Sequence, residues 1–216
     1  MSNQEWFRKT TWTENDSEDF FAHLKRSRKT SRVQYLKIQA YHLYETNRLK
    51  EISAALELAN LALDEYPERI YLAQLFEQKA ECLNKLGKVK EAEEIFLLAL
   101  QAMREVPNVK PNVQFSFGSF VIEHKISRLH KEVLMILDEF NDIGNGIILP
   151  STEYYFYGIK AIILNREGNL KEAKPFAQRA MAAAEKQVSG FSRHPKVGLV
   201  NKTEGMFYNE LVSVAQ

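Results

Sequence analysis

The sequence predicts an all-α protein built from antiparallel helix pairs, and two observations lead to that prediction. The stretch Leu86–Leu100, LGKVKEAEEIFLLAL, indicates a tight turn at Gly87 followed by an amphipathic helix, and a related stretch recurs at Glu167–Met181. The chain of 216 residues contains only nine Gly and six Pro, which favours long regular elements over irregular loops.

The first thirty residues are predicted to form a strap and a short helix. Residues 1–15 are polar and show no periodicity. Three aromatic side chains in this strap are expected to pack against the first helices: Trp6, Phe7 and Trp12. Asp16 or Ser17 is the candidate cap of a helix that runs to about Arg28. The expected buried side of that helix consists of Phe20, Phe21 and Leu24.

The first helix pair is predicted from a cap and from periodicity. Ser31 and Gln34 fit the capping box S-x-x-Q, ahead of a segment whose apolar residues recur at three- and four-residue steps. A turn is expected at Thr46–Asn47. The partner helix is expected over Leu49–Asp64, because Pro67 disfavours helical backbone in the residue before it.

The second helix pair has the clearest pattern. Its first helix is predicted over Tyr71–Leu86 and its second over Val89–Arg104. Gly87 supplies a left-handed cap between them, a conformation that glycine adopts at little cost. Val106–Pro107 is expected to close the pair.

The third pair is less well defined. Asn112–Ser127 fits a helix, but its run QFSFGSFVI also fits a strand, and Leu129–Phe140 fits a second helix. Gly144, Gly146 and Pro150 mark the loop that follows.

The last pair follows that loop. Ser151 is the candidate cap of a helix over Thr152–Asn165, and Gly168 is expected to end it. The next helix is predicted over 169–187, with some bending because Pro175 falls in its second turn.

A long connection and a final helix complete the chain. The connection, 188–201, contains several apolar residues that a solvated linker would not carry, which argues against disorder. The final helix, Thr203–Val214, is expected to cover the end of the helical array.

The two clearest pairs share a pattern of small residues after the turn glycine, at positions +5 and +12. These residues are Ala92 and Ala99 after Gly87, and Ala173 and Ala180 after Gly168. Small residues let two helices approach closely. The pattern resembles the tetratricopeptide repeat, a 34-residue helix–turn–helix unit.

The resemblance covers roughly residues 31–187, as two well-matched and two degenerate repeats. It implies an all-α, TPR-like right-handed superhelix of antiparallel helix pairs with extra N- and C-terminal helices. The expected organisation is a strap and short helix (1–30), a repeat array (31–187), and a loop with a capping helix (188–216), all within one compact domain.

The resemblance also implies that the first helix of each pair lines a concave face that binds an extended peptide or a partner helix. The groove positions of the family fall on Gln34, Lys37, Tyr41, Tyr44, Gln74, Glu77, Glu81, Asn84, Tyr155, Ile162, Asn165 and Arg166. The alternative is that these are solvent-facing positions of surface helices. Members that bind chaperone tails use a Lys/Asn/Lys/Arg clamp. Lys37 fits one clamp position, but Tyr41 stands where an Asn is needed, which disfavours that activity.

A basic segment without acidic residues, Leu24–Arg32, suggests a second kind of binding. Its cations could neutralise phosphates while nearby aromatic rings stack on bases. The candidate anion-binding residues are Lys25, Arg26, Arg28, Lys29 and Arg32. We favour a solvated helix end instead, because the formal net charge of the chain is only +1. Residues 192–196 form a second cationic spot that could join the first.

Enzymatic, metal and cofactor sites are not expected. No two of the five His residues lie at the i, i+4 spacing of a helical metal site, and no phosphate loop, dinucleotide motif or nucleophile elbow occurs. The single cysteine, Cys82, lies beside an apolar helix face, where a buried inert thiol is expected.

We therefore expect a non-enzymatic protein- or peptide-binding scaffold that uses the concave face. Binding of nucleic acid or another polyanion through 24–32 is the alternative, and docking of the array on copies of itself is a third. No signal peptide or membrane span is recognised, so a cytoplasmic location without membrane contact is expected.

Overall fold

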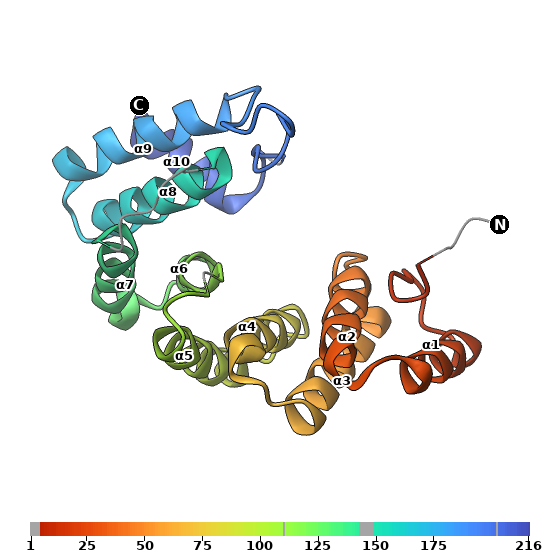
Figure 1. Ribbon diagram of the computed structural model, residues 1–216. Coiled ribbons are helices and arrows are strands. Elements are labelled where there is room, and N and C mark those ends of the chain that lie inside the picture. Colours follow the sequence, from red (N-terminus) through yellow and green to blue (C-terminus); the bar gives the residue numbers. More distant parts are fainter. Residues whose placement is uncertain (1–4, 110, 143–148, 202) are drawn as a thin grey trace. The chain divides into compact units, whose positions relative to one another are not determined.

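The computed structural model describes residues 5–109, 111–142, 149–201 and 203–216. Over these residues the chain forms ten α-helices, one short 3-10 helix and no strand, so the prediction of an all-helical protein with packed helix pairs is confirmed. Two compact units are distinguished, Met1–Val113 and Gln114–Gln216, here called unit 1 and unit 2. Figure 1 shows their helices. Among the described residues, no helix is both long enough and apolar enough to cross a membrane.

Each unit consists mainly of helices joined by short turns. Unit 1 contains α1 (Glu14–Arg26), α2 (Lys29–Tyr44), α3 (Leu49–Glu65), α4 (Arg69–Lys85) and α5 (Val89–Glu105). Unit 2 contains nearly all of α6 (Val113–Glu123), then η1 (Ser127–Leu129), α7 (His130–Asp142), α8 (Pro150–Arg166), α9 (Leu170–Ala184) and α10 (Met206–Ala215).

The helix pairs α2–α3 and α4–α5 repeat with a step of 40 residues. The first helices begin at 29 and 69, and the second helices at 49 and 89. The turn inside each pair contains a left-handed residue at the matching position, Asn47 (φ 55°) and Gly87 (φ 75°). Asn is among the few residues other than Gly that adopt this conformation readily. The step exceeds the 34 residues of a tetratricopeptide repeat.

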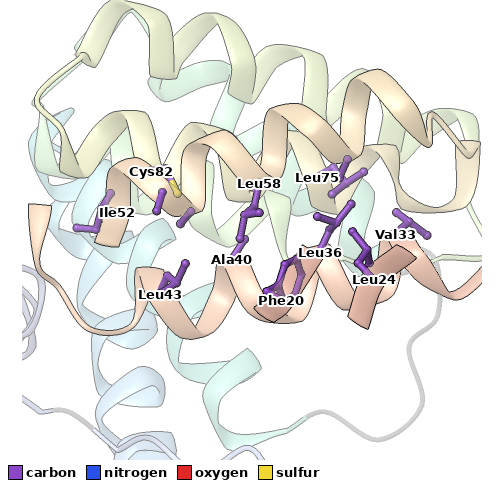
Figure 2. Close-up of a cluster of buried hydrophobic side chains, with 13 residues drawn as sticks. Phe20, Leu24, Val33, Leu36, Ala40, Leu43, Ile52, Leu58, Leu75 and Cys82 are labelled. Atoms are coloured by element: carbon purple, nitrogen blue, oxygen red, sulfur yellow. The ribbon is translucent and has the colours of Figure 1, made fainter. Parts of the chain in front are cut away.

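The core of unit 1 is formed by apolar side chains from its first four helices. Figure 2 shows Leu36 and Leu43 of α2 directed toward Leu58 and Ile52 of α3, with Phe20 of α1 beside them. Leu36, Leu43 and Phe20 are completely buried. Burial of such a side chain stabilises a fold by about 1.5–3 kcal/mol, so these residues anchor α1 and α3 on α2.

The N-terminal strap packs against α1 and α2 through aromatic rings, as predicted. The Trp6 ring lies 5.2 Å from that of Phe20 and 4.8 Å from that of Tyr35. The buried side chain of Gln39 pairs with the strap backbone: its amide donates to Lys9 O at 2.7 Å, and its Oε1 accepts from Lys9 N at 3.0 Å. The exchange satisfies a buried amide and fixes the strap on α2.

Small residues allow the helices of a pair to pack closely. Ala92 and Ala99 of α5 are completely buried, as are Ala173 and Ala180 of α9, which confirms their predicted packing role. Gly118 of α6 has the same role, because a Cβ atom there would lie 2.9 Å from Ile159 of α8.

In unit 2, α8 and α9 form a hairpin covered by α10, visible in Figure 1. Gly158 of α8 accommodates α10: a Cβ atom there would lie 2.9 Å from the ring of Phe207. The predicted covering role of the last helix is thus confirmed for unit 2, although the helix begins at Met206 rather than Thr203. Pro175 lies inside α9, which continues past it.

The connection between α9 and α10 closes on itself through hydrogen bonds. Ser189 N donates to Pro195 O at 2.7 Å, and Ser189 Oγ donates to His194 O at 3.0 Å. Gly198 O accepts from Ser151 N at 2.7 Å, which attaches the loop to the start of α8.

Three predicted helix starts are wrong. The cap of α1 is Thr13, which forms a capping box with Asp16, so Asp16 and Ser17 lie inside the first turn. Helix α2 begins at Lys29, and Ser31 is already helical because its N–H bonds Arg28 O. Helix α8 starts with Pro150, a residue suited to the first helical position, so Ser151 is not its cap.

Two further predictions concern the third pair and the loop after it, and one concerns α1. The segment that fitted either a helix or a strand is the helix α6, with Phe117 and Phe120 buried. The predicted loop at Gly144 and Gly146 lies outside the described residues.

Phe21, expected on the buried side of α1, is instead 39% exposed.

Candidate partner-binding face

Polar side chains of α2 and α4 meet along one side of unit 1. We call this surface the α2–α4 face. It consists of Gln34, Lys37, Tyr41, Tyr71, Gln74, Glu77, Gln78 and Glu81. Its α2 residues are spaced by three and four positions, which places them on one side of the helix. Direct hydrogen bonds link the two helices, so the first helices of successive pairs pack side by side.

Lys37 lies at the centre of the face. Its Nζ donates to Gln74 Oε1 and lies 5.1 Å above the centre of the Tyr71 ring. Burial lowers the pKa of Lys37, and the charge of Glu77 acts in the opposite direction. The cation is therefore held by α4 and is less accessible to a ligand than a surface lysine.

Tyr41 is the most accessible aromatic ring of the face, with 51% of its surface exposed. Partial burial raises the pKa of its hydroxyl, and the charges of Glu45 and Glu81 add to this effect. An exposed tyrosine ring combines an apolar contact surface with a hydroxyl that can form a hydrogen bond.

Two amide side chains extend the hydrogen bonding along the face. Gln34 Nε2 donates to the Tyr71 hydroxyl at 3.3 Å, and Gln78 Nε2 donates to the backbone carbonyl of Lys37 at 3.1 Å. Gln78 Oε1 is buried and has no hydrogen-bond partner in the described structure. These amides join α2 to α4 and offer the kind of groups that can hydrogen-bond a peptide backbone.

The remaining candidates of unit 1 are half-buried, like Lys37 and Gln74. Tyr44 is half-buried and packs against the hydrophobic core. Glu77, Glu81 and Asn84 are half-buried on α4, and each takes part in an interaction with another group. The structure thus brings Gln34, Lys37, Tyr41, Gln74, Glu77 and Glu81 into the α2–α4 face, whereas Tyr44 packs against the core.

The candidates on α8 have different surroundings. Ile162 is completely buried, so the expectation that it lines a binding face is wrong, because that side of α8 faces the core of unit 2. Tyr155 is 40% exposed, and its ring lies 5.8 Å from that of Phe207 on α10. Asn165 is half-buried.

Arg166 joins three helices of unit 2. Its Nε and Nη2 donate to the two carboxylate oxygens of Glu210 at 2.7 Å each, and its Nη1 donates to Ile122 O at 2.9 Å. Only 17% of the side chain is exposed. A guanidinium that is bidentate with one carboxylate and bonded to a carbonyl has a structural role in holding α10 and α6 on α8.

The basic segment lies where α1 ends and α2 begins. Arg26 Nε donates to Ala22 O at 3.0 Å, and Arg32 Nη2 donates to Lys25 O at 2.7 Å. Both arginines thus bond backbone carbonyls near the C-terminus of α1, where cations are favoured by the helix dipole. Arg28 is the N-cap residue of α2, and Lys29 is its first residue.

A hollow of about 520 Å³ lies beside this segment, but its charges are mixed. Lys29 and Arg32 line one part of it, and Glu65 and Glu68, at the end of α3 and the start of α4, line another. Two carboxylates beside two cations weaken the field that an anion would need.

Outside the α2–α4 face, we consider possible metal ligands, the cysteine and one buried histidine. Among the described residues, no group of three His, Cys, Asp or Glu side chains is arranged to hold a metal ion. Cys82 is completely buried in the core, as predicted, and burial raises the pKa of its thiol to about 12. His130 is buried with its Nδ1 2.5 Å from Glu167 Oε1, a contact that joins α7 to the end of α8.

Two residues of the face, Tyr71 and Gln78, and the adjoining Glu45 were not identified from the sequence. Tyr71 and Gln78 lie three residues before and four residues after the predicted Gln74, so they share its side of α4. Glu45 follows the end of α2, four residues after Tyr41. All three lie at helical spacing from predicted residues, whereas the groove positions of the family pattern do not include them.

Comparison of the chain with models of known protein families, with curated proteins and with solved structures gives no match. The resemblance to tetratricopeptide repeats therefore stays a prediction, and functional inference depends on the residues of the chain itself.

Proposed function

We propose that this chain is a non-enzymatic scaffold that binds a protein or peptide through the α2–α4 face. The main observation in support is the direct contact between two successive first helices, with Gln34, Lys37 and Gln74 joined in one polar network and Tyr41 exposed beside it. A preorganised surface of amides and tyrosine can bind a partner with little loss of side-chain entropy.

We also propose that the helix pairs follow a TPR-like superhelical arrangement within each unit. The support is the pair of left-handed glycine turns, Gly87 and Gly168, each followed by buried alanines at the same spacing. The 40-residue step in unit 1 means that its pairs are longer than the standard repeat.

The alternative, polyanion binding through 24–32, has weaker support. Arg26 and Arg32 donate to backbone carbonyls, and the adjoining hollow contains two glutamates. A salt-independent affinity for single-stranded RNA, or an affinity unchanged in the triple variant Arg26→Gln, Arg28→Gln, Arg32→Gln, would eliminate it.

A pull-down from cells of the source organism tests the main proposal. The wild-type chain is expected to recover a stoichiometric protein partner, and Gln34→Ala with Tyr41→Ala is expected to lose it. Met135→Ala is the matched control, because Met135 of α7 is also 51% exposed but lies in unit 2. Recovery of the same partner by the double variant would contradict the proposal.

A further inference from the structure

The loop between α9 and α10, residues 188–201, contains cations without carboxylates. It includes Arg193 and Lys196 but no Asp or Glu. Lys186, just before the loop, forms an ion pair with Glu153 of α8. Arg193 and Lys196, in contrast, form no ion pair or side-chain hydrogen bond within the part of the chain that the structure describes, and both are exposed. The loop therefore presents two positive charges that no neighbouring carboxylate compensates.

Three apolar side chains of the same loop face solvent. Val188 is 64% exposed, Val197 is 49% exposed and Phe191 is 38% exposed. Single exposed apolar residues are common on protein surfaces and need no explanation. Here, three of them lie within one short loop and alternate along the chain with the two free cations, which produces a surface that is both apolar and cationic.

A tight turn forms the tip of the loop. His194 N donates to Phe191 O at 3.0 Å, and Phe191 N donates to Ser189 Oγ at 3.2 Å. Arg193 lies inside that turn, between the two residues that the first bond joins. The exposed ring and one free cation are therefore held close together.

The base of the loop brings the other members of this surface together. Ser189 N donates to Pro195 O at 2.7 Å, so Val188 and Lys196, which adjoin this bonded pair, are close to each other. Val197 follows Lys196 directly. Because the loop is also bonded to the start of α8, its side chains are presented on an ordered backbone, which lowers the entropy cost of binding.

The shape and composition of this surface favour a lipid bilayer over a peptide or a nucleic acid. Peptides are bound in grooves or along helix faces, whereas Figure 1 shows the loop beyond the C-terminal end of α9. Bases need aromatic rings to stack on, and the loop offers one ring and two valines. Apolar side chains of any shape can enter the boundary between headgroups and acyl chains while neighbouring cations stay with anionic headgroups.

We propose that the α9–α10 loop binds the surface of a membrane that contains anionic lipids. Its three apolar side chains enter the headgroup boundary, and Arg193 and Lys196 pair with the anionic headgroups. Contact of this kind needs no spanning helix, so here we depart from the expectation of a location without membrane contact. The loop belongs to unit 2, and its role does not depend on the α2–α4 face of unit 1.

Sedimentation of the full chain with sucrose-loaded vesicles tests this role. The wild type is expected to bind vesicles made of equal parts of phosphatidylcholine and phosphatidylserine, and to bind vesicles of phosphatidylcholine alone much more weakly. Because part of the attraction is electrostatic, the affinity for the anionic vesicles is expected to fall as salt is raised.

The double variant Arg193→Gln with Lys196→Gln tests the cations. It is expected to weaken binding to the anionic vesicles by about 20-fold, because each Lys or Arg near such a surface contributes about 5-fold. The matched control is Lys131→Gln with Lys171→Gln, which removes the same charge at exposed positions of α7 and α9 in the same unit. The control is expected to bind like the wild type.

The variant Phe191→Ser tests the apolar contact without a change of charge. It is expected to weaken binding to the anionic vesicles by about 5-fold, because the ring no longer leaves water. Met135→Ser is the matched control, since Met135 is an exposed apolar residue of α7 in the same unit, and it is expected to bind like the wild type.

A polarity-sensitive dye shows whether position 191 enters the lipid. The dye attached to the variant Phe191→Cys is expected to brighten when anionic vesicles are added, and the dye attached to Met135→Cys is expected not to change. The native thiol of Cys82 is buried and stays unlabelled under native conditions. All the changed positions are exposed, and circular dichroism confirms that each variant is folded.

Several results would overturn the assignment of the loop to a membrane. Equal binding to both kinds of vesicle, or to neither, would remove the lipid preference. Equal loss in the control for the cations would assign binding to overall charge, and full binding by Phe191→Ser would reduce it to charge alone. Binding of a labelled oligouridine in place of vesicles, with loss in the same variants, would assign the loop to nucleic acid. All these results leave the proposed function of the α2–α4 face intact.

Discussion

Cys82 provides an internal reporter for the folding of unit 1. Burial raises the pKa of its thiol to about 12, with a further contribution from the charge of Glu81. Because the thiolate is the reactive form, the native thiol is expected not to react with Ellman's reagent at pH 8, and to react stoichiometrically in urea. Rapid reaction of the native protein would show that α4 opens far more readily than its packing indicates.

Asp16 is expected to make unit 1 less stable as the pH falls into the acid range. Its pKa is lowered to about 2, first because the Thr13 N–H donates to the carboxylate at 3.0 Å. The ionised form therefore stabilises the folded state above about pH 4, and this stabilisation is lost as the pH falls from about 4 to about 2.

The variant Asp16→Asn removes this titration. Urea unfolding at pH 5 is expected to show a loss of about 1 kcal/mol, the usual effect of weakening a helix cap. The difference between wild type and variant should become smaller at pH 2.5. A constant difference at both pH values would mean that Asp16 acts through its shape rather than its charge.

The turns at Gly87 and Gly168 require a left-handed backbone conformation, which glycine adopts at little cost. Gly87 has a φ of 75°, and apart from its chain neighbours no described atom lies within 4 Å of the place where a Cβ would be. Gly87→Ala is therefore expected to lose about 1 kcal/mol through backbone strain alone, measured by chemical denaturation. The control is Lys85→Ala in the last turn of α4, where the exposed side chain should change stability by less than about 0.5 kcal/mol.

The contact between α4 and α5 has no room for a larger side chain at Ala92. Ala92→Phe is expected to destabilise unit 1 by at least about 3 kcal/mol, because a completely buried methyl group would be replaced by a ring. The control is Glu91→Phe, at the exposed neighbouring position, which should keep the melting temperature of the wild type. It shows whether the loss at Ala92 comes from burying the ring or from introducing a ring at all. If Ala92→Phe melts like the wild type, the assigned packing of α4 on α5 is wrong.

The helices could be predicted from the sequence because their apolar periodicity is local. α3, α4 and α5 begin and end within two residues of their expected positions. The first residues of α1 and α8 were harder to predict, because the caps of these helices are unusual. Thr13 forms a box with an Asp at the third position instead of Glu or Gln, and α8 starts with Pro150 without a side-chain cap.

The candidate binding residues could be predicted only in part, because exposure depends on which helix packs on which. The contact of Lys37 with Gln74 follows from two aligned helical stripes that the sequence contains. The roles of Arg166 and Ile162 do not, since α10 and the core of unit 2 decide them through residues far along the chain. Tertiary contacts of this kind leave no local pattern.

At the scale of the whole molecule, the division into two units predicts separate responses to truncation. A chain that ends at Glu204 lacks α10, which covers Gly158 and supplies the partner of Arg166. Unit 2 is expected to lose its cooperative thermal transition, since a nearly buried guanidinium is left without its carboxylate.

Unit 1 of the truncated chain should remain folded. Protection of Cys82 from Ellman's reagent reports on unit 1, and circular dichroism reports the loss of helix in unit 2. Exposure of Cys82 in the truncated chain would show that the folding of unit 1 depends on unit 2.

The clamp between Arg166 and Glu210 also bears on the order of events during synthesis. The two residues are 44 positions apart, and the ribosome makes Arg166 first. Unit 1 is complete in sequence before α8 is translated, and its helix pairs are neighbours in the chain, so they can fold as they emerge. In contrast, when the hairpin α8–α9 has been translated, Arg166 still lacks its carboxylate partner until Glu210 is made. Premature termination in this interval should leave a nascent chain with one folded half and one half that cellular quality control can recognise.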